Sequence, residues 1–317
     1  MIRRFRPAVA RIAALAALAV MSTFAQTAPP QVRRPADQVY RAGVEMVSLS
    51  VTVLDQQSHY LTDLDSKDFL IYEDGARQEI SYFNRTTLPI ALSLLLDTSA
   101  SMDERMLIAQ DAAVGFVRKL RPQDLAQVVD FDTRVEILQD FTSDAAALEK
   151  AIRSAQAGGS TSMYNALYIS LKELAKIKAR NDDDVRRRAV VLLSDGEDTS
   201  SLVTFEEVLD LAKRSATTIY SIGLQSKDTG VSKGFREAEF VLRQLAQETG
   251  GRAFFPRRVE DLAGIYSVIA DELFSQYTLG YASTNPKRDG GWRRLNVQTN
   301  RQGTATRTKR GYFAPAS

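Results

Sequence analysis

Continuous apolar runs alternate with segments of helical periodicity from Pro89 to about residue 276. Strands without polar alternation are buried on both faces, and the interleaved helices cover those faces. The pattern therefore predicts an α/β fold over residues 88–276, a doubly wound, Rossmann-like domain with a mostly parallel sheet. The apolar runs read IALSLLLD at 90–97, LAQVVDF at 125–131, RAVVLLSD at 188–195, TIYSIGL at 218–224 and GRAFF at 251–255. The helical segments lie near 106–120, 144–156, 163–174, 204–215, 235–249 and 259–276.

The segments on either side of this domain have the pattern of strands instead. In residues 47–53, apolar and hydroxyl side chains alternate with the period of a half-buried strand. Asp74-Gly75 separates two further strand-like runs, which is a hairpin signal. Residues 40–87 are therefore a small β unit, and residues 277–317 supply more strands, with NPKRDGG as the turn between the first two. We expect both ends to build one smaller β domain; the alternative is separate additions to the main sheet.

Residues 1–25 have the organisation of a signal peptide. Four arginines precede the apolar run IAALAALAVM, and small residues follow it, placed for cleavage near Ala25. The alternative is an uncleaved N-terminal anchor, although a spanning helix needs about 20 apolar residues. Residues 26–39 form a polar, proline-rich spacer that we expect to be flexible. The sequence therefore predicts an exported protein, periplasmic or secreted, with no transmembrane segment in the mature chain.

Composition narrows the class of protein. The chain has 317 residues, of which 44% are hydrophobic and 25% charged, typical of a globular protein with an ample core. Its 41 basic and 39 acidic residues give a net charge of +2, but four of the arginines lie in residues 1–25. The mature chain is therefore slightly acidic, and no basic patch indicates nucleic acid. With no cysteine, disulfides, thiolate metal sites and cysteine catalysis are excluded.

Oxygen-bearing side chains gather where two predicted strands end. Asp97, Ser99 and Ser101 follow one buried run, and Asp195 closes another. Thr161 lies between them in sequence, in the glycine-containing stretch GGSTSMYNAL before a helix. Open α/β sheets bind ligands at the carboxyl ends of their strands, so these side chains should converge. Two carboxylates and three hydroxyls suit a hard cation: Mg²⁺ first, with Mn²⁺ or Ca²⁺ possible.

These residues resemble the metal-ion-dependent adhesion site of von Willebrand factor type A (VWA) domains, which reads DxSxS, then a distant Thr, then a distant Asp. The likeness covers residues 88–276, and the flanks resemble the exported VWFA-related family common in Acidobacteria. One departure is Ser160 beside Thr161; we assign Thr161 because TSMYNAL then aligns with the family's TxLYDA helix start. The resemblance implies a metal-dependent protein-binding module, not an enzyme, in which a partner's Asp or Glu completes the metal shell.

Other interpretations of these motifs remain. VVDFDTRV resembles the motif of haloacid dehalogenase-like phosphatases, with Asp130 as nucleophile and Asp132 as acid, but the only later acidic cluster is Asp182–Asp184 in a polar stretch. A serine hydrolase is disfavoured, because the chain contains no GxSxG motif and its single histidine, His59, lies far away in sequence. Ser99 or Ser101 could simply cap a helix. A metal-free structural scaffold is the last alternative.

Overall fold

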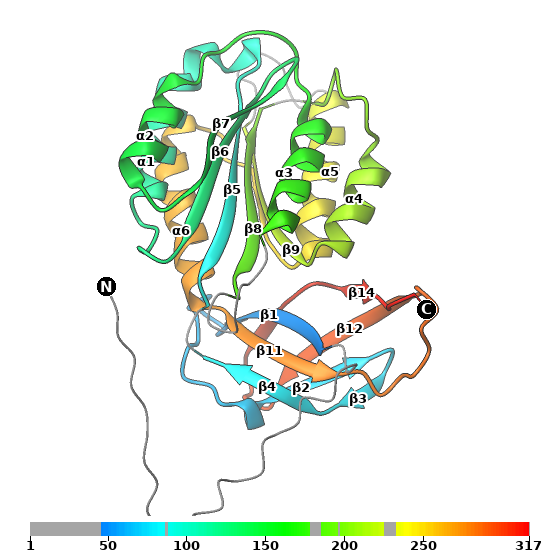
Figure 1. Cartoon of the computed structure of the whole chain (residues 1–317). Coiled ribbons are helices and arrows are strands. Elements are labelled where there is room, and N and C mark those ends of the chain that lie inside the picture. Colours follow the sequence, from blue (N-terminus) through cyan, green and yellow to red (C-terminus); the bar gives the residue numbers. More distant parts are fainter. Residues whose placement is uncertain (1–45, 86–87, 178–184, 196, 225–232, 317) are drawn as a thin grey trace, which may run out of the picture. The chain divides into compact units, whose positions relative to one another are not determined.

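The computed structural model describes residues 46–85, 88–177, 185–195, 197–224 and 233–316 (Figure 1). The predicted signal peptide (1–25), the predicted spacer (26–39) and Asp182–Asp184 lie outside the described residues. The described residues belong to one compact unit, Val44–Ser317. No helix in these parts of the chain is both long enough and apolar enough to cross a bilayer.

Six strands form the main sheet, in the order β10-β9-β8-β5-β6-β7. All neighbours are parallel except β6 and β7, which are antiparallel. The predicted doubly wound, mostly parallel sheet is therefore confirmed. The strands are β5 (Ile90–Asp97), β6 (Leu125–Phe131), β7 (Val135–Thr142), β8 (Arg187–Ser194), β9 (Thr217–Gly223) and β10 (Ala253–Phe254).

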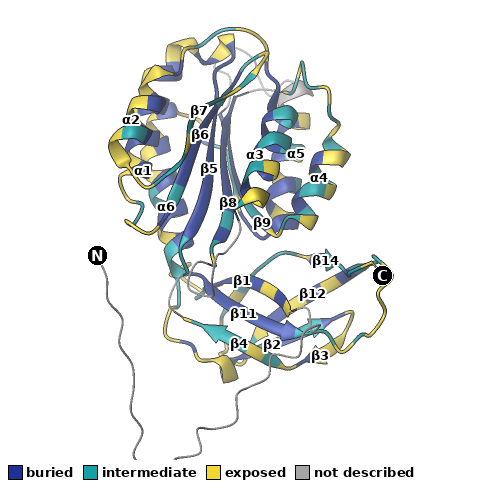
Figure 2. Ribbon diagram, in the orientation of Figure 1, coloured by how far each residue is buried: buried dark blue, intermediate teal, exposed yellow. Residues whose placement is uncertain are grey.

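Helices cover both faces of the main sheet, so the sheet itself is buried (Figures 1 and 2). One apolar core joins the sheet to α1, α2 and α6, and a second core joins its other face to α3, α4 and α5. The helices are α1 (Met106–Val117), α2 (Ala145–Ser154), α3 (Met163–Lys176), α4 (Phe205–Arg214), α5 (Lys233–Thr249) and α6 (Leu262–Ser275), with 3₁₀ turns η1 (Ser66–Asp68), η2 (Ala100–Arg105) and η4 (Val259–Asp261).

The strand β7 was not predicted. Its side chains are only partly buried or exposed, because it is the antiparallel edge of the sheet beside β6. An edge strand of this kind lacks the continuous apolar run that identifies a buried parallel strand. The hydrophobic pattern therefore revealed the five other strands of the main sheet and missed this one.

Two four-stranded antiparallel sheets, hereafter the flank sheets, are built from the ends of the chain. Their orders are β13-β1-β11-β4 and β14-β12-β2-β3, so each sheet contains strands from both ends. Apolar side chains from both sheets form a single core. The strands are β1 (Met46–Leu54), β2 (Phe69–Glu73), β3 (Ala76–Gln78), β4 (Ile80–Asn84), β11 (Tyr277–Ala282), β12 (Trp292–Thr299), β13 (Ala305–Arg307) and β14 (Gly311–Phe313).

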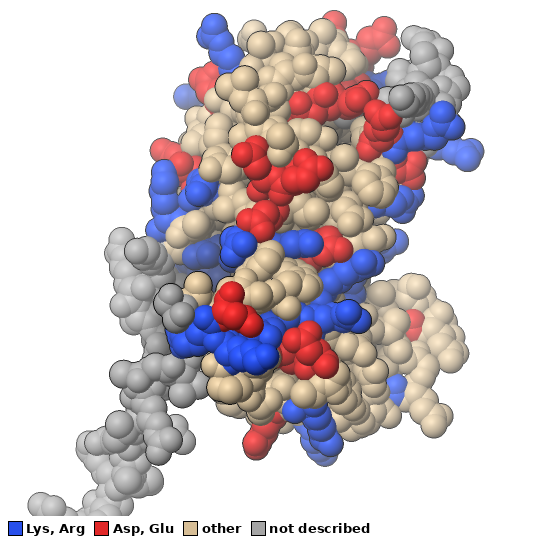
Figure 3. All heavy atoms as spheres, turned by 90° about the vertical axis from the view of Figure 1, so that its right-hand side faces the viewer, with Lys and Arg blue, Asp and Glu red and all other residues tan. Residues whose placement is uncertain are grey.

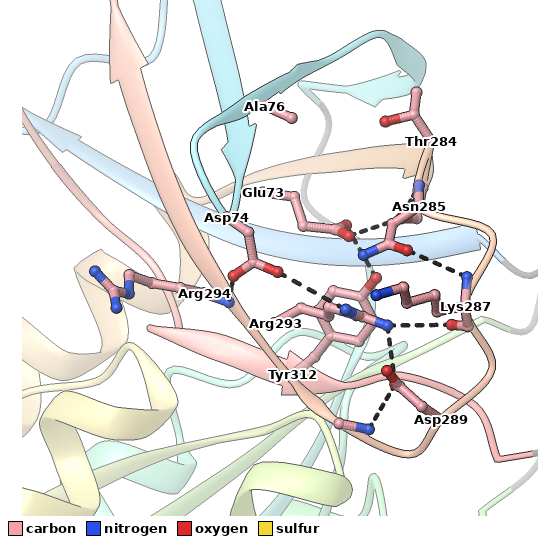
Figure 4. Close-up of polar contacts among 12 residues, drawn as sticks. Glu73, Asp74, Ala76, Thr284, Asn285, Lys287, Asp289, Arg293, Arg294 and Tyr312 are labelled. Atoms are coloured by element: carbon pink, nitrogen blue, oxygen red, sulfur yellow. Dashed lines mark hydrogen bonds and ion pairs between the residues drawn. The ribbon is translucent and has the colours of Figure 1, made fainter.

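The segment 283–291 is not a hairpin turn, because the strands on either side of it, β11 and β12, lie in different sheets. Polar contacts fix this crossover (Figure 4). Glu73 is buried and accepts hydrogen bonds from Tyr281 Oη and Ser283 Oγ, each at 2.7 Å, and from Tyr312 Oη at 3.0 Å. Arg293 donates to Asp289 Oδ1 at 2.9 Å across the end of the crossover. Side chains distant in sequence therefore determine where the chain changes sheets.

Glu272 of α6 joins the flank sheets to the main sheet. Its side chain is fully buried and accepts a hydrogen bond from Tyr220 Oη of β9 at 2.9 Å. From the flank segments, Thr52 Oγ1 and Tyr60 Oη each donate to it at 3.4 Å, and Arg307 forms an ion pair with it. A buried carboxylate is stable only when it is paired and hydrogen-bonded, so these contacts depend on one another.

We predict that Leu279→Ala destabilises both halves of its flank sheet together. Leu279 is fully buried on β11, paired with Leu49 on β1 and Phe83 on β4. Truncating a buried leucine costs about 2–5 kcal/mol of unfolding free energy. Hydrogen exchange should therefore accelerate in both β1 and β4. The control Leu202→Ala, at a side chain that is 93% exposed, should leave exchange unchanged; loss of protection in β4 alone would contradict the interleaved arrangement.

Candidate metal centre

Asp97 is the last residue of β5, and its side chain is buried at the carboxyl end of the main sheet. The strand lies between β6 and β8, so the ends of three parallel strands meet there. Ser194 Oγ at the end of β8 donates to Asp97 Oδ2 at 2.5 Å, and the Ser99 amide donates to Oδ1 at 2.9 Å. The carboxylate is therefore held by the neighbouring strand and by the loop that follows it.

The two serines of the DxSxS motif continue this network. Ser99 Oγ and Ser101 Oγ lie 3.1 Å apart, and Ser101 Oγ donates to Asp195 Oδ1 at 2.8 Å. Ser99 occupies the N-cap position of η2, yet its side chain makes no capping hydrogen bond. The helix-cap alternative is therefore wrong for Ser99, and both hydroxyls face the carboxylates instead.

Asp195 directly follows β8 and is also buried, at 7% exposure. Its second oxygen, Oδ2, accepts a hydrogen bond from Arg105 Nη1 at 2.7 Å, in an ion pair whose side chains are 11% and 2% exposed. Sequence reasoning missed Arg105. The available signal was its position six residues after Ser99, since one short helix, η2, brings the guanidinium back over the loop. The centre therefore contains a cationic side chain of its own.

Thr161 lies in a loop that runs beside the DxSxS loop. The Gly158 amide donates to the Thr98 carbonyl at 2.7 Å, and the Ala100 amide donates to the Gly159 carbonyl at 3.2 Å. Gly159 has a φ of +72°, and a Cβ there would lie 2.7 Å from Asp132 Oδ2, so the path requires glycine.

Backbone bonds also connect Thr161 to the loop after Asp195. Its carbonyl accepts from the amides of Thr199 and Ser200 at 2.9 and 3.1 Å. The neighbouring Ser160 is exposed, whereas Thr161 is 6% exposed. Hydrogen bonds thus connect four of the five predicted ligands directly, while Thr161 is placed alongside them by its loop.

Desolvation dominates the electrostatics of the two acids. Burial raises the pKa of Asp97 to about 6, against the lowering effect of Ser194 and Ser99; the Asp195 charge raises it further. Burial also raises the pKa of Asp195, and Ser101 and Arg105 oppose that shift. Without a cation, the centre therefore holds its carboxylates in an environment that disfavours their charge.

The donor set fits a hard divalent cation chemically. The described residues contain no group of three or more His, Cys, Asp or Glu side chains that could hold a metal. The centre instead combines two carboxylates with hydroxyls, and Mg²⁺, Mn²⁺ and Ca²⁺ accept such oxygens. A hydroxyl can turn its proton away and present a lone pair, so the present hydrogen bonds do not preclude coordination.

The carboxylates of the phosphatase alternative lie at the β6–β7 turn. Burial raises the pKa of Asp130 to about 6, with smaller effects from Glu136 and Asp132. Asp130 pairs directly across the strands with Glu136, and Asp132 Oδ1 accepts from the Arg134 amide of the same turn at 2.7 Å. The hydrogen bond of Asp132 is therefore explained by the local turn.

One family model and several known proteins match parts of this chain. Residues 92–197 match the family described as the von Willebrand factor type A domain. The uncharacterized protein sll0103 of Synechocystis is 36% identical over 113 residues, which cover 35% of this chain and 26% of that protein. A UPF0353 protein of Mycobacterium tuberculosis is 24% identical over 224 residues, covering 64% of each chain. This chain thus spans less than two thirds of either relative.

Among solved structures, a von Willebrand factor type A protein from Catenulispora acidiphila superposes with a TM-score of 0.50 at 12% identity. The superposition covers 87% of this chain and 76% of that one. At this identity the likeness concerns the fold alone. Because residues 88–276 make up less than 87% of the chain, the superposition also includes part of the flanks.

We predict that Asp97→Asn stabilises the protein in chelator at neutral pH. The folded-state pKa of Asp97 lies above its ordinary value of 3.8, so its stabilising contribution is full below about pH 4 and is lost as the pH rises through about 6. The advantage of the variant should therefore grow by up to about 3 kcal/mol between pH 4 and pH 7.

Urea unfolding of parent and variant at each pH measures this difference. The exposed Asp103→Asn serves as the control and should show no such growth. A variant whose advantage is constant from pH 4 to pH 7 would disprove the desolvation argument.

Proposed function

We propose that this protein, which carries a von Willebrand factor type A domain, is an exported protein-binding module that depends on a divalent cation. One observation carries the proposal. Hydrogen bonds through the Ser99 amide and the two serine hydroxyls connect Asp97, Ser99, Ser101 and Asp195 at the carboxyl end of the main sheet. VWA domains generally bind proteins, which favours a binding role over an enzymatic one.

In this proposal the ligands of Mg²⁺, Mn²⁺ or Ca²⁺ are Asp97, Ser99, Ser101, Thr161 and Asp195. When bound, the cation supplies a positive centre that attracts a carboxylate. Two ionised aspartates balance a divalent cation, and Arg105 adds one positive charge in contact with Asp195. The loaded centre would therefore carry about one net positive charge, which favours an incoming Asp or Glu of a protein or peptide partner.

The proposed location rests on residues 1–25, with cleavage near Ala25 and release to the periplasm or the exterior. The resemblance of the flanks to exported VWFA-related proteins is also a prediction, and it agrees with this proposed location. N-terminal sequencing of the native protein should give a mature chain beginning near Gln26. An intact Met1 on the mature species would indicate the uncleaved anchor instead.

We predict that Mg²⁺ stabilises the parent protein but not Asp97→Ala. At a free Mg²⁺ concentration 100 times the dissociation constant, the parent should gain about 2.7 kcal/mol of unfolding free energy by mass action. Thermal melts in Mg²⁺, Mn²⁺, Ca²⁺ and chelator measure the effect, and isothermal titration measures metal uptake. A parent that takes up no metal would indicate the metal-free scaffold, and metal-dependent phosphatase activity lost in Asp130→Asn would indicate the enzyme.

Arg105→Gln separates cation binding from partner binding. Removing the guanidinium frees one oxygen of Asp195, so Mg²⁺ should bind more tightly. The surplus positive charge disappears at the same time, so an acidic peptide should bind the Mg²⁺-loaded variant more weakly than the loaded parent. If both affinities fall together, Arg105 only supports the local structure.

A further inference from the structure

A cavity of about 200 Å³ lies at the amino end of the main sheet, where this end meets the flank sheets. We infer that it binds a small tetrahedral oxyanion, phosphate or sulfate. Its walls come from the first residues of β8 and β9, the ends of α4 and α5, and strands β1 and β11. The residues that carry the argument are Arg187, Arg188, Lys213, Thr278, Thr308 and Lys309.

The lining has a large excess of positive charge. Among the residues that the structure describes, five basic side chains and one acid, Glu248, line it. Glu248 is already paired, with Lys213 at 3.0 Å and Arg310 at 3.5 Å. Figure 3 shows Lys and Arg side chains across the middle of one side of the molecule, with Asp and Glu side chains among them. Glu248 therefore does not balance the charges of Arg187, Arg188 and Lys309.

Three of the cations contact only neutral groups among the described residues. Arg187 donates to the Leu273 carbonyl at 2.7 Å and to the side-chain amide of Gln276. Arg188 donates to the carbonyls of Ile177 and Ser215, at 3.1 and 3.4 Å. Lys309 Nζ lies over the ring of Tyr312, 5.9 Å from its centre. A partly buried cation without a carboxylate is costly unless an anion is present.

Hydroxyl groups in the same lining lack partners. Thr278 is 3% exposed and its Oγ1 has no hydrogen-bond partner in the described structure, and the buried Oγ1 of Thr308 also has none. Both atoms lie within the wall of the cavity, and buried polar atoms are nearly always hydrogen-bonded, so an acceptor oxygen bound beside this wall would give them partners. The cations are also short of compensation: burial lowers the pKa of Lys309 to about 8 and that of Arg187 to about 10, so their charged forms are disfavoured without an anion.

Size and chemistry select the class of ligand. Cavities for drug-sized molecules measure about 300–1,000 Å³, so this one suits a smaller group. An oxyanion offers several acceptor oxygens, which can pair with cations and hydroxyls at once. Because the walls come from both the main sheet and the flank sheets, a bound anion would stabilise their contact. The site is independent of the proposed metal centre.

Isothermal titration of the metal-free full chain with inorganic phosphate, sulfate and chloride tests the inference. Phosphate or sulfate should bind at one site and raise the melting temperature, and chloride at equal ionic strength should not. Lys309→Gln and Thr278→Val should each weaken binding at least tenfold. The matched controls are Lys150→Gln, an exposed lysine of α2, and Ser170→Ala, a buried unpartnered hydroxyl of α3; both should bind as the parent does.

Melting in anion-free buffer guards against misfolded variants. Removing an uncompensated cation or an orphaned hydroxyl should leave the melting temperature unchanged or higher, so Lys309→Gln and Thr278→Val should fold. The inference is wrong if neither oxyanion binds at millimolar concentration. It is also wrong if folded Lys309→Gln and Thr278→Val bind phosphate as tightly as the parent.

Discussion

Burial of β5 on both faces is the constraint on which the rest of the structure depends. All eight of its residues are buried, and parallel neighbours lie on both sides of it. A strand in this position can end only at the rim of the sheet, beside the ends of β6 and β8. Asp97 is therefore delivered to a fixed point with Ser194 next to it. The candidate metal centre is a consequence of how the core is packed.

The acids at this rim are stabilised by a limited set of neighbours. Desolvation raises the pKa of both Asp97 and Asp195, and the opposing contacts are hydroxyls, backbone amides and Arg105. Removing water from a carboxylate costs free energy that hydrogen bonds only partly offset. Such a cluster is more easily explained as a site for a cation than as a source of stability. Arg105 gives the centre part of the charge that a cation would supply.

The two ends of the main sheet carry opposite excess charge. The carboxyl ends of β5 and β8 hold two aspartates, Asp97 and Asp195, and one arginine, Arg105, which pairs with Asp195. At the amino ends, Arg187 and Arg188 begin β8 and Lys309 lies nearby in the same cavity lining. Glu272 of α6, which is buried against the flank segments, forms an ion pair with a different arginine, Arg307. The two ligands that we propose, a divalent cation at one end and an oxyanion at the other, follow this opposition of charge.

The sequence alone indicated the main domain and the five oxygen-bearing side chains predicted as metal ligands. Buried parallel strands read as continuous apolar runs, and a motif such as DxSxS is local, so both are visible without coordinates. It did not determine the edge strand β7, whose side chains are only partly buried, or the partition of the terminal strands between two sheets. Nor did it reveal Arg105 on Asp195, or Arg188 and Lys309 around one cavity. Only the tertiary structure decided these, because contacts between residues far apart in sequence depend on how elements pack, and no local pattern records that packing.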